Sequence, residues 1–173
     1  MKTAYIGLGS NLGDSLCTLR AAWQDVGSHP GISVGHLSSP YRSEPVGMVS
    51  ANWFINAVGL LRTTLPPLAL LSHLLAVEQR FGRQRDEGAV GYQDRTLDLD
   101  LLLYDDLLLS HQQLVLPHPE LHRRLFVLLP LCELAPELRH PSLGLTMREL
   151  LQARQAESDH AVCLRAAWPQ VFP

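Results

Sequence analysis

Two periods of hydrophobic and polar positions run along the chain, and they predict its helices and strands. Apolar residues recur at helical spacing in four segments, for which we expect helices. These segments are residues 15–26, 66–81, 125–135 and 146–155. Short apolar or alternating runs instead predict strands. They cover residues 3–8, 33–42, 53–61 and 97–104, with a small hairpin at 107–109 and 114–116.

The order of the first six of these elements is strand, helix, strand, strand, helix, strand. This β-α-β-β-α-β order predicts a ferredoxin-like α+β sandwich with a mainly antiparallel sheet, both main helices on one face, and extra C-terminal helices. A chain of 173 residues is long enough to bury a core of its own. We therefore expect a single domain over residues 1–173, in which residues 154–173 form a tail of unknown role.

The composition excludes several classes of protein. Hydrophobic residues make up 46% of the chain and charged residues 18%, which is typical of a folded domain. A net charge of −3 argues against binding nucleic acid through a broad basic face. No apolar run is long enough for a membrane span, and the three cysteines have no C-x-x-C spacing. We therefore expect a cytoplasmic protein with reduced thiols that binds neither nucleic acid nor a membrane.

The pattern is most informative in residues 95–104, Arg-Thr-Leu-Asp-Leu-Asp-Leu-Leu-Leu-Tyr. Leucines at 97, 99 and 101 alternate with Asp98 and Asp100. A strand would bury the leucines on one face and present both carboxylates on the other, about 6–7 Å apart along the chain. Two acids at this separation repel each other unless a cation lies between them.

The neighbouring sequence favours one of two interpretations of this acid pair. An isolated D-x-D also fits a solvent-facing strand that carries two charges. Here basic residues flank the pair on both sides: Arg83, Arg85 and Arg95 before it, and His118, Arg123 and Arg124 after it. Carboxylates on a strand suit magnesium, which phosphates often help to coordinate, and arginines suit anions with delocalised charge. Together they predict phosphoryl or pyrophosphoryl transfer.

Three other features allow more than one interpretation. The glycine-containing stretch 7–14 could bind phosphate, but it is neither G-x-G-x-x-G nor a Walker loop, so we expect a strand-to-helix turn. His118 and His122 have the i, i+4 spacing of zinc ligands, but their order is not H-E-x-x-H and no third ligand is evident. Asn56 shares a strand face with apolar neighbours, so it either faces solvent or reads the edge of a heterocycle.

Motifs spread over nearly the whole chain recur together in a known enzyme family. They are Gly7-Leu-Gly-Ser-Asn-Leu-Gly-Asp14, Asn56 after Trp53-Phe54-Ile55, Arg95-Thr-Leu-Asp-Leu-Asp100, Leu116-Pro-His-Pro119, Arg124-x-Phe126 and Pro130-Leu-x-Glu-Leu-Ala-Pro136. By these motifs the chain, from about residue 3 to residue 150, resembles the 6-hydroxymethyl-7,8-dihydropterin pyrophosphokinases of folate biosynthesis. The combination is specific because the motifs are far apart and unrelated in chemistry.

The resemblance implies a reaction in which ATP donates its β- and γ-phosphates as a unit to the hydroxymethyl oxygen of the dihydropterin, giving AMP. It implies that Asp98 and Asp100 are catalytic and hold two magnesium ions. Arg83 and Arg95 match the catalytic arginines that clamp the phosphates. The further positions implied to bind ATP are Glu78, Arg85, Thr96, His118 and Arg124.

The resemblance also implies a pterin site. Phe54 and Phe126 match the aromatic pair around the pterin ring, although spacing alone would place both in the core. Asn56 matches the amide that reads the ring edge. The other implied pterin-binding positions are Ser43, Val46 and Tyr92. ATP and the dihydropterin are then the only partners that we expect, and the chain would act as a monomer without an obligate protein partner.

One departure from the family pattern falls beside the acid pair. Gln93-Asp94 precede Arg95, where the family commonly has glycine followed by proline or a small residue. We expect the carboxylate of Asp94 to weaken the positive field around Arg95. Three alternatives remain: a divergent paralogue with weak activity, a magnesium phosphohydrolase on the same scaffold, and a non-enzymatic sensor of a small molecule. A sensor does not require an acid pair beside arginines, and a phosphohydrolase does not require an aromatic–amide pocket.

Overall fold

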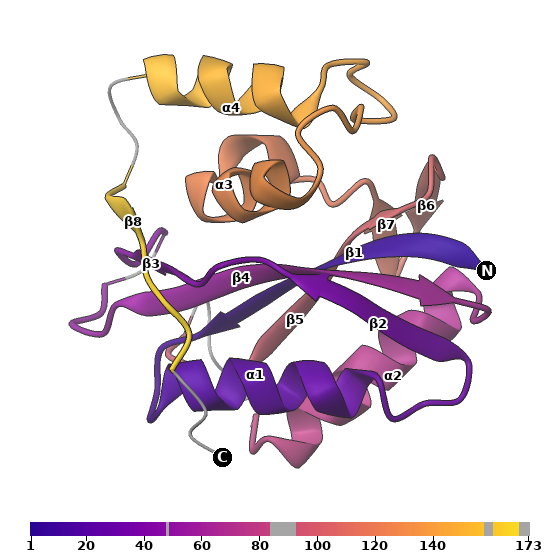
Figure 1. Cartoon of the computed structure of the whole chain (residues 1–173), viewed down its shortest axis with the longest axis horizontal. Helices are drawn as coiled ribbons and strands as arrows, with labels where there is room; N and C mark the ends of the chain where they lie inside the picture. Colours follow the sequence, from indigo (N-terminus) through magenta and orange to yellow (C-terminus); the bar gives the residue numbers. More distant parts are fainter. Residues whose placement is uncertain (48, 84–92, 158–160, 170–173) are drawn as a thin grey trace.

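The computed structural model describes residues 1–47, 49–83, 93–157 and 161–169, and its helices and strands follow the predicted order (Figure 1). The strands are β1 (Lys2–Ser10), β2 (Ile32–Leu37), β3 (Tyr41–Ser43), β4 (Phe54–Thr63), β5 (Asp98–Tyr104), β6 (Leu109–His111), β7 (Leu114–Leu116) and β8 (Cys163–Arg165). The α-helices are α1 (Ser15–Val26), α2 (Pro67–Arg80), α3 (Leu125–Leu134) and α4 (Met147–Ala156), with a short 3₁₀ turn at Leu121–Arg123.

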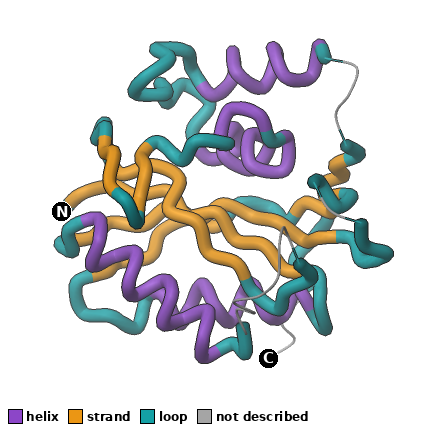
Figure 2. The backbone as a smooth tube through the Cα atoms, turned by 180° about the vertical axis from the view of Figure 1, so that it is seen from behind, coloured by secondary structure: helices purple, strands orange, loops and turns teal. Residues whose placement is uncertain are grey.

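The main sheet is antiparallel and has the strand order β5-β1-β4-β3-β8, with β2 also paired to β4. Helices α1 and α2 cover one face, as predicted, and α3 covers the other, with α4 packed on the outer side of α3 (Figures 1 and 2). The prediction of a mainly antiparallel α+β sandwich with extra C-terminal helices is therefore confirmed.

Each face of the sheet buries its own apolar core. Below the sheet, β1 and the leucines at 97, 99 and 101 pack against α1 and α2. Above it, Val58 of β4 and Leu102 of β5 pack against α3 and α4. Ionised or amide side chains on the upper face must therefore fit between the sheet and α3 or remain exposed. This is the face that carries Asp98 and Asp100.

Helices α1 and α4 begin at side chains that bind free backbone N–H groups, whereas α2 begins without such a side chain. The side chain of Asp14 accepts a hydrogen bond from Cys17 N at 3.1 Å and caps α1. Helix α2 opens with Pro67, for which the missing N–H costs nothing in the first turn. Thr146 and Glu149 form a capping box at the start of α4.

One prediction for the sheet was wrong, and one strand was not predicted. The expected strand 33–42 is divided into β2 and β3, since Ser38 turns its side chain back to accept a hydrogen bond from Val58 N at 3.0 Å and Pro40 has no N–H to donate. The tail also contributes a strand: β8 pairs with β3, where Ser43 lies opposite Cys163.

No helix in the described part of the chain is both long and apolar enough to cross a membrane.

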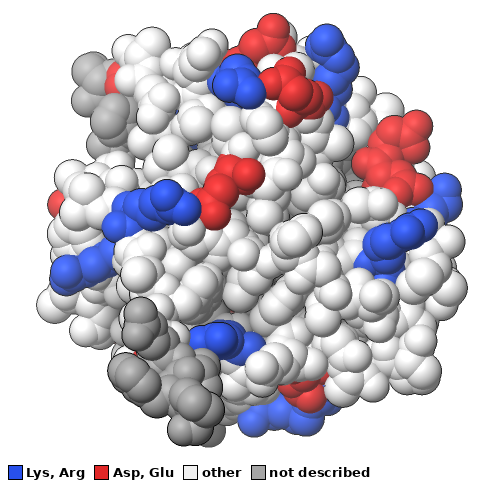
Figure 3. All heavy atoms as spheres, in the orientation of Figure 1, with Lys and Arg blue, Asp and Glu red and all other residues white. Residues whose placement is uncertain are grey.

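The surface in Figure 3 agrees with the low net charge. Lysines and arginines lie scattered on this face of the molecule, often beside aspartates and glutamates, with wide uncharged areas between them. The described residues on this face form no continuous basic area of the kind that a duplex phosphate backbone requires.

Candidate active site

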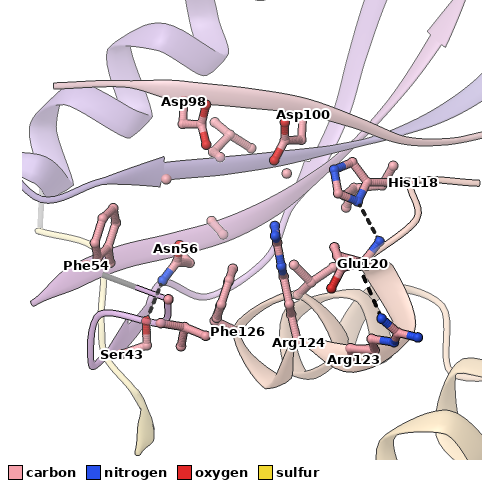
Figure 4. Close-up of a pocket in the computed structure, with 18 of the residues that line it drawn as sticks. Ser43, Phe54, Asn56, Asp98, Asp100, His118, Glu120, Arg123, Arg124 and Phe126 are labelled. Carbon is pink, nitrogen blue, oxygen red and sulfur yellow. Dashed lines mark hydrogen bonds and ion pairs between the residues drawn. The ribbon is translucent and has the colours of Figure 1, made fainter. Parts of the chain in front are cut away.

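A cavity of about 630 Å³ lies between the upper face of the sheet and the segment that leads into α3 (Figure 4). Most of the residues predicted to form the site line it, although they come from distant parts of the chain. They are Ser43, Val46, Phe54, Asn56, Arg83, Arg95, Asp98, Asp100, His118, Arg124 and Phe126. One half of the cavity is charged and the other is neutral, so we refer to these as the charged half and the neutral half.

Strand β1 sets the distance between the two halves. Gly9 lies opposite Asn56 of β4 on one side and opposite Asp98 of β5 on the other, so the three residues form a row across the sheet. Gly7 lies in the next row, opposite Asp100. Because neighbouring strands are about 4.8 Å apart, Asn56 and Asp98 are separated by roughly 10 Å.

The two glycines of this strand keep the cavity open. A Cβ atom on Gly9 would lie 3.2 Å from Asn56 Oδ1, and one on Gly7 would lie 3.4 Å from Leu102. The prediction of a turn over residues 7–14 is wrong for its first part, because β1 continues to Ser10. The glycines therefore serve as the floor of the cavity, a role that only the pairing of β1 with both neighbours reveals.

Asp98 is held by two arginines in the charged half. Arg83 Nη1 donates to Asp98 Oδ1 and to Glu78 Oε1, and Arg95 Nη1 donates to Asp98 Oδ2 at 2.7 Å. The two arginine side chains are only 18% and 14% exposed, so their charges act in partly desolvated surroundings. Both guanidinium groups face the cavity and can also receive an anionic ligand.

Asp100 lies deeper than Asp98, and its surroundings disfavour the ionised carboxylate. Burial, and after it the neighbouring charge of Asp98, raise the pKa of Asp100 to about 7, although Arg124 opposes the shift. Figure 4 shows both carboxylates pointing to the same side of β5, with Arg124 reaching toward them from the segment before α3. A divalent cation between the carboxylates would remove this repulsion.

The donor set suits magnesium better than zinc. Two carboxylates on a strand supply hard oxygen ligands, and magnesium normally keeps water or phosphate at its other positions. Among the residues that the structure describes, no three or more histidine, cysteine, aspartate or glutamate side chains are grouped to hold a metal ion. The i, i+4 pair His118 and His122 is thus not part of a three-ligand zinc site.

Glu78 and Thr96 do not line the cavity. Glu78 is buried below the charged half, where its carboxylate accepts hydrogen bonds from Leu99 N at 2.7 Å and from Arg83. It therefore fixes β5 and Arg83, which explains an acid in the last turn of α2, where the helix dipole disfavours one. Thr96 has a buried Oγ1 for which no hydrogen-bond partner is present in the described structure. Arg85 and Tyr92 lie outside the described residues.

The neutral half is built on Asn56. This side chain is 6% exposed, so the solvent-facing alternative is wrong, and its Nδ2 donates to Ser43 Oγ at 2.9 Å. Phe54 and Phe126 are only partly buried and line the cavity, whereas spacing alone predicted core positions. In Figure 4, Asn56 lies between the two rings. Aromatic faces around one amide form a suitable surface for a flat polar ring.

His118 lies at the far end of the charged half. Its Nδ1 accepts a hydrogen bond from Glu120 N at 3.1 Å, which assigns the proton of the neutral ring to Nε2. Burial and the nearby charge of Arg124 both lower the pKa of His118. A neutral imidazole that donates through Nε2 is therefore expected at neutral pH. Glu120 also forms an ion pair with Arg123 at 3.6 Å, and both residues line the cavity.

The carboxylate of Asp94 binds polar side chains that do not line the cavity. It accepts hydrogen bonds from Ser50 Oγ at 2.6 Å, Asn11 Nδ2 at 2.6 Å and Asn52 Nδ2 at 2.9 Å. These bonds, led by that of Ser50, lower the pKa of Asp94. The charge of Arg95 lowers this pKa as well, so the expectation that Asp94 weakens the positive field around Arg95 stays a prediction. The sequence could have suggested these hydrogen bonds only through the polar run at residues 50–52, whose partners are far away in the chain.

The fold and the cavity together define a class of protein. A paired carboxylate site with arginines beside it is suited to polyphosphate and magnesium, and an aromatic–amide surface on the same cavity is suited to a heterocyclic acceptor. The class is that of an enzyme that transfers a phosphate-containing group.

Comparison with known proteins identifies the family. Residues 5–136 match the model of the 7,8-dihydro-6-hydroxymethylpterin-pyrophosphokinase (HPPK) family. The 2-amino-4-hydroxy-6-hydroxymethyldihydropteridine pyrophosphokinase of Methylorubrum extorquens is 40% identical over 151 residues, which cover 87% of this chain and 92% of the relative. The protein with the same name in Pseudomonas aeruginosa is 40% identical over 153 residues, covering 88% and 92%. The chain therefore belongs to the HPPK family and is a pyrophosphokinase of folate biosynthesis.

Solved structures agree with this fold at low sequence identity. A crystal structure of an HPPK-DHPS in complex with substrates superposes with a TM-score of 0.70 at 12% identity, over 88% of this chain. A Plasmodium falciparum HPPK-DHPS superposes with a TM-score of 0.71 at 16% identity, also over 88% of this chain. The match spans 43% and 45% of those longer proteins, so it concerns their fold in that part only.

Proposed function

We propose that the charged half of the cavity binds Mg-ATP and the neutral half binds 6-hydroxymethyl-7,8-dihydropterin. The hydroxymethyl oxygen would attack the β-phosphorus of ATP, the bond between that phosphorus and the α,β-bridging oxygen would break, and AMP would leave. The observation that carries this proposal is the row Asn56–Gly9–Asp98 across the sheet. It places a candidate ring-reading amide and a candidate metal ligand roughly 10 Å apart in one cavity.

Asp98 and Asp100 are the residues that would hold magnesium, and we infer two ions from the two carboxylates and the long anionic triphosphate. Bound magnesium supplies positive charge where negative charge grows on the leaving phosphate oxygen, and it helps to ionise the attacking hydroxyl. The raised pKa of Asp100 supports the proposal, because the site favours an added cation or proton.

The basic side chains have positioning and charge-neutralising roles in this proposal. Arg83 and Arg95 would bind the β- and γ-phosphates, and Arg124 would complete the positive surface from the opposite wall. His118 would donate its Nε2–H to a phosphate oxygen or to the nucleotide. Glu78 would act indirectly by holding Arg83 and β5, which is a positioning role. These groups replace water around the phosphates with fixed donors.

The pterin ring would lie between Phe54 and Phe126, with its amide-like edge toward Asn56. The Ser43 hydroxyl holds the Asn56 side chain by a 2.9 Å bond to Nδ2, and Oδ1 of Asn56 can accept a hydrogen bond from a ring N–H. Val46 would cover the ring from the loop after β3. This arrangement leaves the hydroxymethyl group directed toward the charged half.

We also infer that one chain over residues 1–173 forms a single functional domain that acts as a monomer. One chain supplies residues to both halves of the cavity, which supports a single functional domain. The tail supports the neutral half through β8, whose Cys163 lies opposite Ser43.

The test is to incubate the protein with 6-hydroxymethyl-7,8-dihydropterin, ATP and magnesium and to identify the nucleotide product. We expect AMP in a one-to-one ratio with the dihydropterin diphosphate, and no turnover when either the pterin or magnesium is omitted. Release of ADP or inorganic phosphate independent of pterin would instead support a phosphohydrolase. Binding of both ligands without any product would support a sensor.

A further inference from the structure

The carboxylate of Glu133, in the last turn of α3, binds the segment that leads from β2 into β3. Its Oε1 accepts hydrogen bonds from Ser39 N and Ser39 Oγ, both at 3.0 Å, and its Oε2 accepts one from the Tyr41 hydroxyl at 3.1 Å. Arg165 of β8 forms an ion pair with Oε1 at 3.5 Å and donates to Ser39 Oγ at 2.7 Å. We refer to Glu133, Ser39, Tyr41 and Arg165 as the Glu133 cluster. These four residues lie outside the lining of the cavity.

On the helix side, the Glu133 cluster holds the element that carries Phe126. The two residues are seven positions apart on α3, which is close to two full turns, so they share one side of the helix about 10.5 Å apart along its axis. Figure 1 shows α3 lying over the sheet beside β3 and β4. Hydrogen bonds are directional, so they restrain sliding of the helix more sharply than apolar contacts do. The anchored end at Glu133 therefore helps to fix the position of the Phe126 ring.

On the sheet side, the Glu133 cluster adjoins Asn56. Tyr41 lies opposite Asn56 in the pairing of β3 with β4, and Ser43, two positions further along the same face, accepts the hydrogen bond of Asn56 Nδ2 at 2.9 Å. Tyr41 is buried, and this burial, followed by the hydrogen bond to Glu133, raises the pKa of Tyr41 to about 12. The phenol therefore remains a neutral donor to Glu133 at physiological pH.

We propose that Glu133 is a positioning residue for the pterin site: by attaching the end of α3 to β3, it sets the gap between Phe126 and Asn56 in which the ring lies. Such a gap has a narrow tolerance, because an error of about 0.5–1 Å forfeits roughly a quarter to a half of the van der Waals attraction. The inference rests on the proposed function, since that function assigns the pterin ring to this gap.

A glutamate is well suited to this position. A carboxylate has two acceptor oxygens and no donor, and here it meets a backbone N–H, a hydroxyl, a phenol and a guanidinium. The Glu133 side chain is 29% exposed, so these charge-assisted bonds are only partly screened by water. A glutamine would keep one acceptor oxygen for Ser39 and would offer its NH₂ group to the Tyr41 hydroxyl. We therefore expect glutamine to retain part of the function and alanine to retain none.

The experiment separates the KM for the dihydropterin from kcat and from the KM for ATP. Steady-state AMP formation is measured with each substrate varied in turn, for the wild type, Glu133→Ala, Glu133→Gln and Tyr41→Phe. We expect the KM for the dihydropterin to rise about tenfold in Glu133→Ala, less than the roughly 100-fold that a misplacement of about 1 Å can cost. Glu133→Gln and Tyr41→Phe should raise it about threefold, the effect of losing one hydrogen bond. The other two constants should change little.

Glu137→Gln is the matched control. Glu137 is an exposed acid in the turn after α3, and its carboxylate also forms an ion pair, with Arg148 at 2.7 Å. The same acid-to-amide change there should leave all three constants at the wild-type values. A rise in the KM for the dihydropterin as large as that of Glu133→Gln would overturn the inference, because the effect would then follow from any lost charge near α3.

The remaining outcomes separate a positioning role from a structural one. A purely structural role would lower the melting temperature of Glu133→Ala and leave its KM for the dihydropterin unchanged, which would overturn the inference, as would a loss of kcat alone. If Glu133→Ala does not fold, Tyr41→Phe decides in the same way, because it loses only a hydroxyl. A wild-type protein that forms no AMP would refute the proposed function and this inference with it. AMP formation with unchanged KM values in the variants would overturn this inference alone.

Discussion

The two halves of the cavity are stabilised by different kinds of interaction. In the charged half, Asp98 is bound by Arg83 and Arg95, and the buried Glu78 fixes Arg83 from below. In the neutral half, the Asn56 amide is held by one hydrogen bond to Ser43, and the remaining contacts are with aromatic rings. The first half is a network of ionised groups, whereas the second is a surface of neutral groups.

Because of this difference, we expect the charged half to determine mainly kcat and the neutral half to determine mainly the KM for the ring-containing substrate. Charged groups placed in advance act where charge develops in the transition state, so their removal should lower kcat. Neutral contacts to the ring are the same in the ground state and in the transition state, so their loss should mainly raise KM. Without a cation, the two carboxylates of the charged half repel each other, as the raised pKa of Asp100 indicates. The neutral half has no comparable unfavourable state. The following predictions test this division.

The largest effect is expected for Asp98→Asn. The substitution removes a metal ligand and leaves Arg83 and Arg95 without their shared carboxylate. We expect magnesium-dependent AMP formation to fall by about 10³-fold or more, the upper range for loss of one electrostatic contact in an active site. Circular dichroism and thermal melting should show a folded protein. An AMP rate near that of the wild type would remove Asp98 from the metal site, and the exposed Asp106→Asn variant provides the control for a simple change of charge.

A smaller and different effect is expected for Asn56→Ala. Loss of the amide would remove a hydrogen bond to the ring and leave the Ser43 hydroxyl without its partner, a cost of about 1–3 kcal/mol. We therefore expect the KM for the dihydropterin to rise roughly 10- to 100-fold, with little change in the KM for ATP. Steady-state kinetics with each substrate varied in turn measures both. An equal rise in both constants would contradict the division between the two halves.

The third prediction concerns stability without magnesium. The pKa of Asp100 in the folded protein is raised to about 7, above its ordinary value of 3.8. Between these values the folded state binds more protons than the unfolded state, so the contribution of Asp100 to stability is lost as pH rises through this window. Asp100→Asn has no charge to bury. At pH 8 without magnesium it should be more stable than the wild type by up to about 4 kcal/mol, since the pKa is raised by about 3 units and each unit corresponds to about 1.4 kcal/mol.

The pH dependence provides the control for this third prediction. At pH 4 the difference in melting temperature between Asp100→Asn and the wild type should nearly vanish, because Asp100 of the wild type is then protonated in the folded state. Magnesium at pH 8 should stabilise the wild type more than the variant. If Asp100→Asn is less stable than the wild type at pH 8, the carboxylate has a favourable partner in the fold and the argument from repulsion is wrong.

The sequence predicted the charged half better than the neutral half, and the reason is physical. The alternation around Asp98 and Asp100 is a local property of one strand, so periodicity alone placed both acids on one face. Phe54 and Phe126 line a cavity because of how α3 packs over β4, and no local pattern distinguishes such a ring from a core residue. Their assignment came from the family resemblance.

Other features could not be predicted because they depend on contacts between residues that are far apart in the chain. Gly7 and Gly9 gained their role from the pairing of β1 with both β4 and β5. The hydrogen bonds of Asp94 could not be predicted from the sequence, because two of their donors lie about 40 and 80 positions away in the chain. The strand β8 was missed because a three-residue strand on a sheet edge has almost no pattern of its own.

The smallest expected effect tests whether the neutral half depends on the tail. Glu44 N donates to Val162 O at 3.1 Å, and Val162 N donates to the Glu44 carboxylate at 3.1 Å. Glu44→Ala removes only the second of these bonds, which is exposed. We expect a rise of about threefold in the KM for the dihydropterin, corresponding to roughly 0.6 kcal/mol, and no change in kcat or in the KM for ATP. A loss of kcat would show that the tail supports the charged half as well, and the boundary between the two halves would then have to be redrawn.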